Sequence, residues 1–301
     1  MTALTSTAPI ETAAEQRLRR RLVVMTLLAG LVAAGVLVAM VLQELDLGSK
    51  RGGWTFDYYA SWLKNADALR RRFTWDVIAA VLGSGVMLTL LAPWLVTRWE
   101  RTTVALSLVA GTVLQVALRS VYKHSLPRLI KSWGANSFWT VTNDHPIERF
   151  VSEFDRLGPT LAGHAKHNMP GKVLLYYFLE LFTKDVTRLG VLIIALSTLG
   201  GLFVYLITRD LTGDRRAAIF ALALFSVIPS KLSFLPILNT VTPLLIFAAL
   251  WLLVRALDSN RLVYAALLGP TLYVTLLFEP LPLVLGILFA ALVLRAQWGQ
   301  W

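Results

Sequence analysis

The chain contains no cysteine, and it has few side chains that titrate near neutral pH. Without cysteine, disulfide bonds, cysteine-ligated zinc and thiol catalysis are excluded. Only 4 of the 301 residues are histidine, and 16% are charged. The sequence also shows no internal repeat, glycine-rich phosphate loop or low-complexity tract. Any chemistry must therefore depend on a small number of polar residues.

Apolar residues dominate what is present: 56% of the chain is hydrophobic and the mean hydropathy is +0.63. A soluble domain has about 45–50% apolar residues. Crossing the hydrocarbon takes about 20 helical residues, and these runs lack the alternation of strands. The sequence therefore predicts an all-α transmembrane bundle of about eight or nine spans. The predicted spans are 22–43, 75–97, 102–120, 189–207, 216–234, 237–254, 261–277 and 280–296, with a shorter apolar run at 172–183.

The amino-terminal region predicts which side of the membrane each loop occupies. The first apolar run, 22–43, follows four arginines and exceeds a signal-peptide core of roughly 7–15 residues. We therefore expect an uncleaved first span and a disordered tail, 1–21, on the inside. Residues 22–301 then form one transmembrane domain, whose loops 44–74 and 121–170 both lie on the outer face.

The net charge of +11 suits a protein that faces anionic lipid phosphates or an anionic substrate. The basic residues are spread over several loops and form no nucleic-acid-binding motif. The basic hairpin 98–101 lies inside, as the positive-inside rule favours. Strict counting of spans, however, places Arg209, Arg215 and Arg216 outside. Either the run 172–183 is not a span, or these arginines face a phosphate-bearing substrate.

The loop 121–170 has a pattern of its own. Asn143-Asp144-His145-Pro146 is typical of a helix start, with an Asx cap and a proline in the first turn. Apolar residues then recur at helical spacing from Ile147 to Leu157, with charged residues opposite. This pattern predicts an amphipathic helix of about three turns in the membrane interface. Tryptophan and tyrosine in both outer loops prefer the same depth.

A polar element follows that helix and shows a resemblance to a known family. His164-Ala165-Lys166-His167-Asn168-Met169-Pro170-Gly171 precedes the aromatic run Leu174–Phe178, and Tyr205-Leu206-Ile207-Thr208-Arg209-Asp210-Leu211-Thr212-Gly213 comes later. Over residues 139–216 this order resembles the GT-C superfamily of integral-membrane glycosyltransferases. Its branch of protein mannosyltransferases and lipid A aminoarabinose transferase carries His-Pro-Pro before a Tyr-Tyr helix. Here the first of those prolines is replaced.

The resemblance implies a glycosyltransferase, hexosyl or pentosyl, that takes its sugar from a polyprenyl phosphate. It implies transfer to a glycan, lipid or protein acceptor at the outer face, with a loop carboxylate as general base. A positioned carboxylate can take the acceptor's hydroxyl proton, and nearby cations stabilise the leaving phosphate. The resemblance also places the protein in a bacterial plasma membrane, as part of cell-envelope glycan biosynthesis.

Two acids are candidates for the catalytic base. Asp144 lies upstream of the histidine element in the same loop, as the family's acid does; alternatively it is only a helix cap. Asp57 lies in the first outer loop beside Tyr58 and Tyr59, which are candidate substrate contacts. Its alternative is one solvated charge in an aromatic stretch at the membrane interface. The sequence leaves the choice between the two acids open.

Five basic residues are candidates for binding the donor phosphate: His164, Lys166, His167, Lys172 and Arg209. The alternatives are solvated histidines, lysines that snorkel at the interface, and an arginine that sets topology. The histidine pair has no visible third ligand, so no metal site is assigned; a divalent metal is an alternative without support in the sequence, and no cofactor is established.

The sequence allows two interpretations of Glu279 and two classes of function. Glu279 lies between two apolar runs, where a carboxylate is a functional candidate unless it sits in a wet turn. The alternative function is a non-catalytic polyprenyl-lipid transporter or an assembly subunit. Because related chains continue beyond the last span, a membrane-protein partner is also an expectation.

Overall fold

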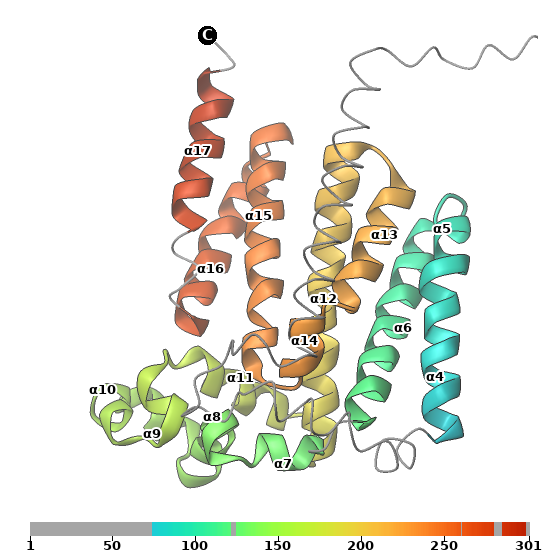
Figure 1. The fold of residues 1–301 in the computed structure, drawn as a ribbon. Helices are drawn as coiled ribbons and strands as arrows, with labels where there is room; N and C mark the ends of the chain where they lie inside the picture. Colours follow the sequence, from blue (N-terminus) through green and yellow to red (C-terminus); the bar gives the residue numbers. More distant parts are fainter. Residues whose placement is uncertain (1–73, 122–124, 260, 280–284, 299–301) are drawn as a thin grey trace, which may run out of the picture. The chain divides into compact units, whose positions relative to one another are not determined.

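The computed structural model describes residues 74–121, 125–259, 261–279 and 285–298 (Figure 1). Within these ranges the regular elements are all helices. The predicted first span 22–43 lies outside the described residues, as do Asp57, Tyr58 and Tyr59. The predicted all-helical architecture is confirmed for the described part of the chain.

Four helices in the described ranges are long and apolar enough to cross a membrane. The first, Trp75–Leu95, consists of α4 (Trp75–Val86), a π-helical turn (Met87–Leu91) and α5 (Ala92–Leu95). The others are α6 (Glu100–Val121), α12 (Val186–Thr212) and Leu238–Ser259, which joins a 3₁₀ turn (Leu238–Thr240) to α15 (Thr242–Ser259). They coincide with the predicted spans 75–97, 102–120, 189–207 and 237–254.

The remaining predicted spans are shorter or broken. The run 172–183 becomes α11 (Gly171–Glu180), whose 10 residues cover only about 15 Å. The span 216–234 is interrupted, because Pro229 disfavours helical geometry at Ile228 and starts a new helix. It forms α13 (Arg215–Ser226) and α14 (Pro229–Phe234). α16 (Leu262–Phe278), with 17 residues, is at the lower limit of about 17 residues for a span, and α17 (Leu285–Trp298) has 14 described residues.

The loop before α11 folds into a layer of short helices, which we call the end layer (residues 125–180). Its helices before α11 are α7 (Leu126–Ile130), α8 (Trp133–Asp144), α9 (Ile147–Ser152) and α10 (Phe154–Leu157). Two 3₁₀ turns follow, at Gly158–Thr160 and Gly163–His167. The layer packs at the end of the bundle where α12 begins (Figure 1). The core of the end layer contains three fully buried residues from different helices: Phe150 of α9, Tyr176 of α11 and Leu189 of α12.

The predicted amphipathic helix is wrong in two respects. α8 continues through Asp144, so Asp144 ends one helix and does not cap the next, and Pro146 is the N-cap of α9. The chain then breaks at Glu153, giving α9 and α10 in place of one helix of three turns. Phe150 and Leu157 are buried against the layer, whereas Val151 on the predicted apolar face is 60% exposed.

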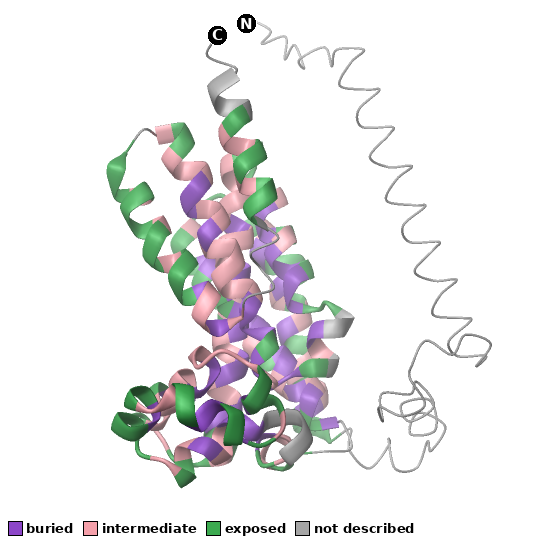
Figure 2. Ribbon diagram, turned by 90° about the vertical axis from the view of Figure 1, so that its left-hand side faces the viewer, coloured by how far each residue is buried: buried purple, intermediate pink, exposed green. Residues whose placement is uncertain are grey.

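Small residues bring the bundle helices together. A Cβ at Gly111 of α6 would lie 2.7 Å from Oγ of Ser226 in α13, and one at Gly200 of α12 would lie 2.9 Å from the ring of Phe225. Such residues drive helix association in membranes, where the lipid is as apolar as leucine. Exposed residues gather on the outward faces of the helices (green in Figure 2). They include Leu90, Trp94 and Val109, as expected for faces that meet lipid.

Candidate functional site

A polar cluster around the buried Lys172 lies where the end layer meets the bundle, and we call it the Lys172 cluster: Asn168, Lys172, Asn239, Thr242 and Glu279. Lys172 Nζ donates to Asn168 Oδ1 and Asn239 Oδ1, both at 3.0 Å. It also lies 3.5 Å from Glu279 Oε2. That same carboxylate oxygen accepts a hydrogen bond of 2.8 Å from Thr242 Oγ1. The cluster therefore joins three segments that are distant in sequence, 168–172, 239–242 and Glu279.

A glycine makes this junction possible. A Cβ at Gly171, the first residue of α11, would lie 2.6 Å from the carbonyl oxygen of Leu277 and 2.8 Å from Cα of Phe278. Real side chains do not approach backbone that closely, so only glycine lets the start of α11 touch the end of α16. Glu279 follows α16 directly and has an extended backbone. It therefore reaches Lys172, which follows Gly171 in α11.

The surroundings of Lys172 balance its charge. Burial, with 1% of the side chain exposed, lowers the pKa of Lys172, and the negative charge of Glu279 opposes that shift. Three acceptors match the three N–H groups of the ammonium. The rings of Phe138 and Phe278 have centroids 5.7 and 5.8 Å from Nζ. Glu279 is thus an ion-pair partner within the protein, and its interpretation as a wet turn residue is wrong.

The histidine element lies directly beside this cluster. His164, Lys166 and His167 are exposed on the 3₁₀ turn Gly163–His167. Asn168 links that turn to the cluster, because its Nδ2 donates to the carbonyl of His164 at 2.7 Å while its Oδ1 accepts from Lys172. The structure therefore brings together four of the five basic residues predicted to bind donor phosphate. Among the described residues, no group of three His, Asp or Glu could hold a metal ion.

Asp144 is exposed at the end of α8, in the same layer but near the other end of α11. Its neighbours Thr142 and His145 contact that part of α11. Thr142 Oγ1 donates to Glu180 Oε1 at 2.7 Å, and the hydroxyl of Tyr177 donates to the carbonyl of His145 at 2.6 Å. Burial, together with the charges of Glu180 and Glu148, raises the pKa of Tyr177 to about 12, so it remains a donor.

Arg209 lies elsewhere, at the opposite end of α12 from the end layer. It donates to Glu100 Oε1 at 2.8 Å and to Asp210 Oδ1 at 3.1 Å. Glu100 also accepts from Tyr205 at 2.9 Å and pairs with Arg215 at 3.0 Å. Twenty helical residues separate Arg209 from Leu189 in the core of the end layer, a distance of about 30 Å. The structure does not bring Arg209 together with Lys172.

These ion pairs also bear on the conflict over topology. Arg209 and Arg215 bind Glu100, so they share one end of the bundle with the basic hairpin 98–101. α11, with 10 residues, is too short to cross a membrane, and α12 runs from the end layer to the end of the bundle that carries these basic residues. This arrangement favours the first of the two alternatives from the sequence.

We expect Arg209→Met to lower the free energy of unfolding by about 1–2 kcal/mol, since Glu100 loses a charge-assisted partner that is only partly exposed to water. Thermal unfolding in detergent, followed by tryptophan fluorescence, measures this change. Arg216→Met removes an exposed arginine from the same turn and serves as the matched control, with no expected change. An Arg209→Met protein of parental stability that no longer binds donor lipid would restore a ligand role for Arg209.

Lys231 and Asn239 did not emerge from the sequence as site residues. Lys231 lies in α14 with 7% of the residue exposed; its Nζ donates to the carbonyl of Ser197 at 3.2 Å and lies 4.2 Å from the ring centroid of Phe225. It lines a pocket of about 350 Å³ together with Asn239 and Thr240. A lysine inside the predicted span 216–234 is the signal that could have identified it.

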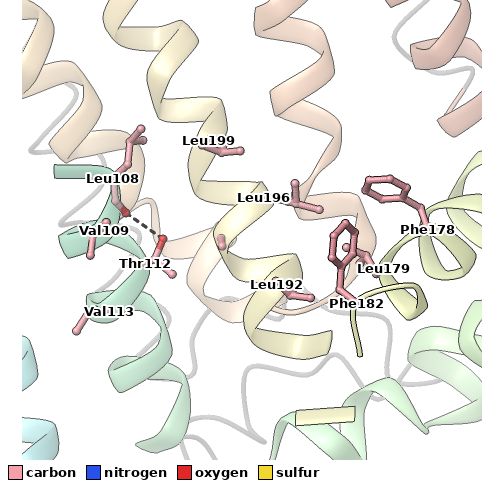
Figure 3. Close-up of a pocket in the computed structure, with 11 residues that line it drawn as sticks. Leu108, Val109, Thr112, Val113, Phe178, Leu179, Phe182, Leu192, Leu196 and Leu199 are labelled. Atoms are coloured by element: carbon pink, nitrogen blue, oxygen red, sulfur yellow. Dashed lines mark hydrogen bonds between the residues drawn. The ribbon is translucent and has the colours of Figure 1, made fainter. Parts of the chain in front are cut away.

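A second cavity is almost entirely apolar. It is a groove of about 470 Å³ lined by residues of α6, α11 and α12. Figure 3 shows Phe178 and Phe182 on one side and Val109 and Val113 on the other. The hydroxyl of Thr112, its polar lining group, is already bonded to the carbonyl of Leu108 at 2.9 Å. Such a groove suits hydrocarbon chains.

The long apolar helices and the lipid-compatible outer faces define the chain as a helical integral-membrane protein. Comparisons with protein-family models, with curated proteins and with solved structures give no significant match.

Proposed function

We propose that the protein is a membrane glycosyltransferase of the GT-C type, which moves a sugar from a polyprenyl phosphate to a glycan, lipid or protein acceptor. The observation that carries the proposal is the junction at Asn168, which sets His164, Lys166 and His167 beside the Lys172 cluster. A polyprenyl phosphate has an anionic head and a long hydrocarbon chain. The basic turn suits the head, and the apolar groove at α11 suits the chain.

The proposed topology has eight spans. These are 22–43, α4–α5, α6, α12, the broken α13–α14, α15, α16 and α17. This order is consistent with the contacts, since Asn239 before α15 and Glu279 after α16 both meet the end layer through Lys172. The basic end that carries Arg209 and Arg215 then faces the cytoplasm. The end layer faces outward, in a bacterial plasma membrane.

Each polar group has a proposed part in the reaction. The carboxylate of Asp144 or of Asp57 takes the proton from the acceptor hydroxyl as the sugar transfers. The exposed cations of the turn Gly163–His167 stabilise the polyprenyl phosphate as it leaves. Lys172, whose N–H groups are already paired, holds that turn in position. Tyr58 and Tyr59 contribute substrate contacts from the first outer loop.

Asp144→Asn and Asp57→Asn, made separately, test the proposed base. Removing the general base is expected to lower the rate of sugar transfer by about 10²–10⁴-fold, because the acceptor proton then has no positioned acceptor. The assay measures transfer from a polyprenyl-phosphate sugar to endogenous acceptor in membranes. Asp155→Asn, an exposed acid in α10 of the same layer, should leave the rate unchanged. Full activity in both Asp144→Asn and Asp57→Asn would rule out either acid as the base.

One observation favours the second candidate, a non-catalytic polyprenyl-lipid transporter or assembly subunit. Asp144 lies near Tyr177 and Glu180, whereas Lys172 lies at the start of α11. A protein that only held lipid phosphate would need the basic turn without an acid beside it. Binding of the polyprenyl lipid without transfer of its sugar to any acceptor would support this candidate.

A further inference from the structure

The broken helix α13–α14 and the 3₁₀ turn Leu238–Thr240 each present a backbone carbonyl that a neighbouring side chain satisfies. Gln115 Nε2 donates to the carbonyl of Ser226, the last residue of α13, at 3.1 Å. Ser197 Oγ donates to the carbonyl of Thr240 at 2.6 Å. Irregular backbone at membrane depth is tolerated only where protein buries it or where it lines a cavity. Here it lines the pocket of about 350 Å³ that contains Lys231.

Lys231 is the charged group of that pocket. Its residue is 7% exposed, and its Nζ bonds to one backbone carbonyl, that of Ser197. No ion pair of Lys231 with a carboxylate occurs among the residues that the structure describes, in contrast to Lys172 with Glu279. An ammonium has three N–H donors, and a buried charge without a counter-charge is costly. Lys231 is therefore poised to meet an anion from outside the chain.

The rest of the pocket defines the kind of anion. Asn239 accepts from Lys172 through Oδ1, so its amide N–H groups are the part left to donate to a ligand. Thr240 adds polar surface beside it. The other lining residues are apolar: Phe225, Ile228, Phe234 and Pro243. This arrangement suits a small anionic head attached to a hydrocarbon body.

We propose that this pocket binds the monophosphate head of an isoprenoid lipid, with its first isoprene units against the apolar wall. The identity of the lipid rests on the proposed function. The new assignment is a second phosphate site, in which the phosphate pairs with buried Lys231; it is separate from the exposed turn Gly163–His167, which is proposed to stabilise the leaving phosphate. Asn239 contacts both this pocket and Lys172, so a bound phosphate is coupled to the turn that carries His164 and His167.

Binding of farnesyl phosphate to the purified full chain in non-ionic detergent tests the assignment, with the dissociation constant measured by thermophoresis. Lys231→Met should weaken binding by about tenfold or more, because a charge-assisted contact is lost. Without ligand, the same variant should melt no lower than the parent, because it removes a buried unpaired charge. If Lys231 had only a structural role, Lys231→Met would lower the melting temperature and leave the affinity for farnesyl phosphate unchanged. Lys184→Met, at an exposed lysine, controls for the change in net charge.

A second variant keeps the test independent of the folding of Lys231→Met. Ile228→Trp fills the pocket from its apolar side without removing the cation, and it should also weaken binding. Unchanged affinity in Lys231→Met and Ile228→Trp would overturn the assignment. Equal affinity for farnesol and farnesyl phosphate would also overturn the assignment. So would displacement of farnesyl phosphate by inorganic phosphate, if inorganic phosphate competes at a concentration as low as that at which farnesyl phosphate half-saturates the protein.

Failure of the proposed pocket and failure of the proposed glycosyltransferase can be distinguished by experiment. Farnesyl phosphate binding that depends on Lys231, in a protein without sugar transfer, would retain the pocket and reject the glycosyltransferase. Sugar transfer by Lys231→Met with an unchanged KM for the donor would reject the pocket and retain the enzyme.

Discussion

Gly171→Ala is expected to lower the free energy of unfolding by about 3 kcal/mol or more. It should also abolish the sugar transfer that we propose for the end layer. The added Cβ would lie 2.6 Å from the carbonyl oxygen of Leu277, 2.7 Å from its carbonyl carbon and 2.8 Å from Cα of Phe278. All three are backbone atoms, so no rotamer change can relieve the contact. The start of α11 must move away from α16, and Lys172 must then leave Glu279. Thermal unfolding in detergent, monitored by size-exclusion chromatography, measures the loss.

Gly269→Ala is the matched control for this change. Gly269 lies within α16, and a Cβ there would meet nothing within 4 Å. In a helix interior alanine is favoured over glycine by up to about 1 kcal/mol, so this variant should be equal to the parent or more stable. If Gly171→Ala melts at the temperature of the parent, the close approach of α11 and α16 is not present in the protein.

Length and hydropathy were enough to predict the long spans. Helices such as α6 and α12 are continuous apolar runs without internal proline, and the hydrocarbon admits no other conformation for them. The same signals could not separate the run 172–183 from a span. Its residues are apolar because α11 packs into the end layer, with Val173 and Tyr176 almost fully buried there. Burial in protein and burial in lipid select the same residue types.

The site was predictable only in part, because sequence spacing does not encode contacts between distant segments. The turn with His164 and His167 was visible as a polar island. The partners of Lys172 come instead from Asn239 and Glu279, 67 and 107 positions further along the chain. Glu279 attracted attention as a carboxylate among apolar runs, yet nothing in the sequence named its partner. Asp144 was predicted to cap a helix, but tertiary packing extended α8 through it.

The arginines show how the status of one short element, the run 172–183, affects an inferred topology. Counting the run 172–183 as a span placed Arg209 and Arg215 outside, where a substrate phosphate would have explained them. Their contacts with Glu100 place them instead at the end of the bundle that carries the hairpin 98–101. With this placement, the proposed topology satisfies the positive-inside rule without a ligand at Arg209.

Lys172→Met should destabilise the protein by about 3–5 kcal/mol, which is typical of breaking a buried ion pair from one side. The variant leaves Glu279, whose side chain is 20% exposed, without its cation, and it leaves Asn168 and Asn239 without their shared donor. The end layer then loses this polar link to α15 and α16 and keeps only the apolar core it shares with them. Chemical unfolding in mixed detergent, followed by tryptophan fluorescence, measures the change, and Lys166→Met at a neighbouring exposed lysine should have little effect.

The double variant Lys172→Met/Glu279→Gln separates the ion pair from the packing of the lysine stem. Much of the cost of Lys172→Met comes from a carboxylate left unpaired in an apolar surrounding, so making that group neutral should restore part of the lost stability. Thr242 can still donate to the amide oxygen of a glutamine at 279, which keeps the bond that now reaches Glu279 Oε2 at 2.8 Å. The two single changes should therefore be strongly non-additive. Additive losses in this cycle would mean that Lys172 and Glu279 act independently, and the end layer would then be held by its apolar core alone.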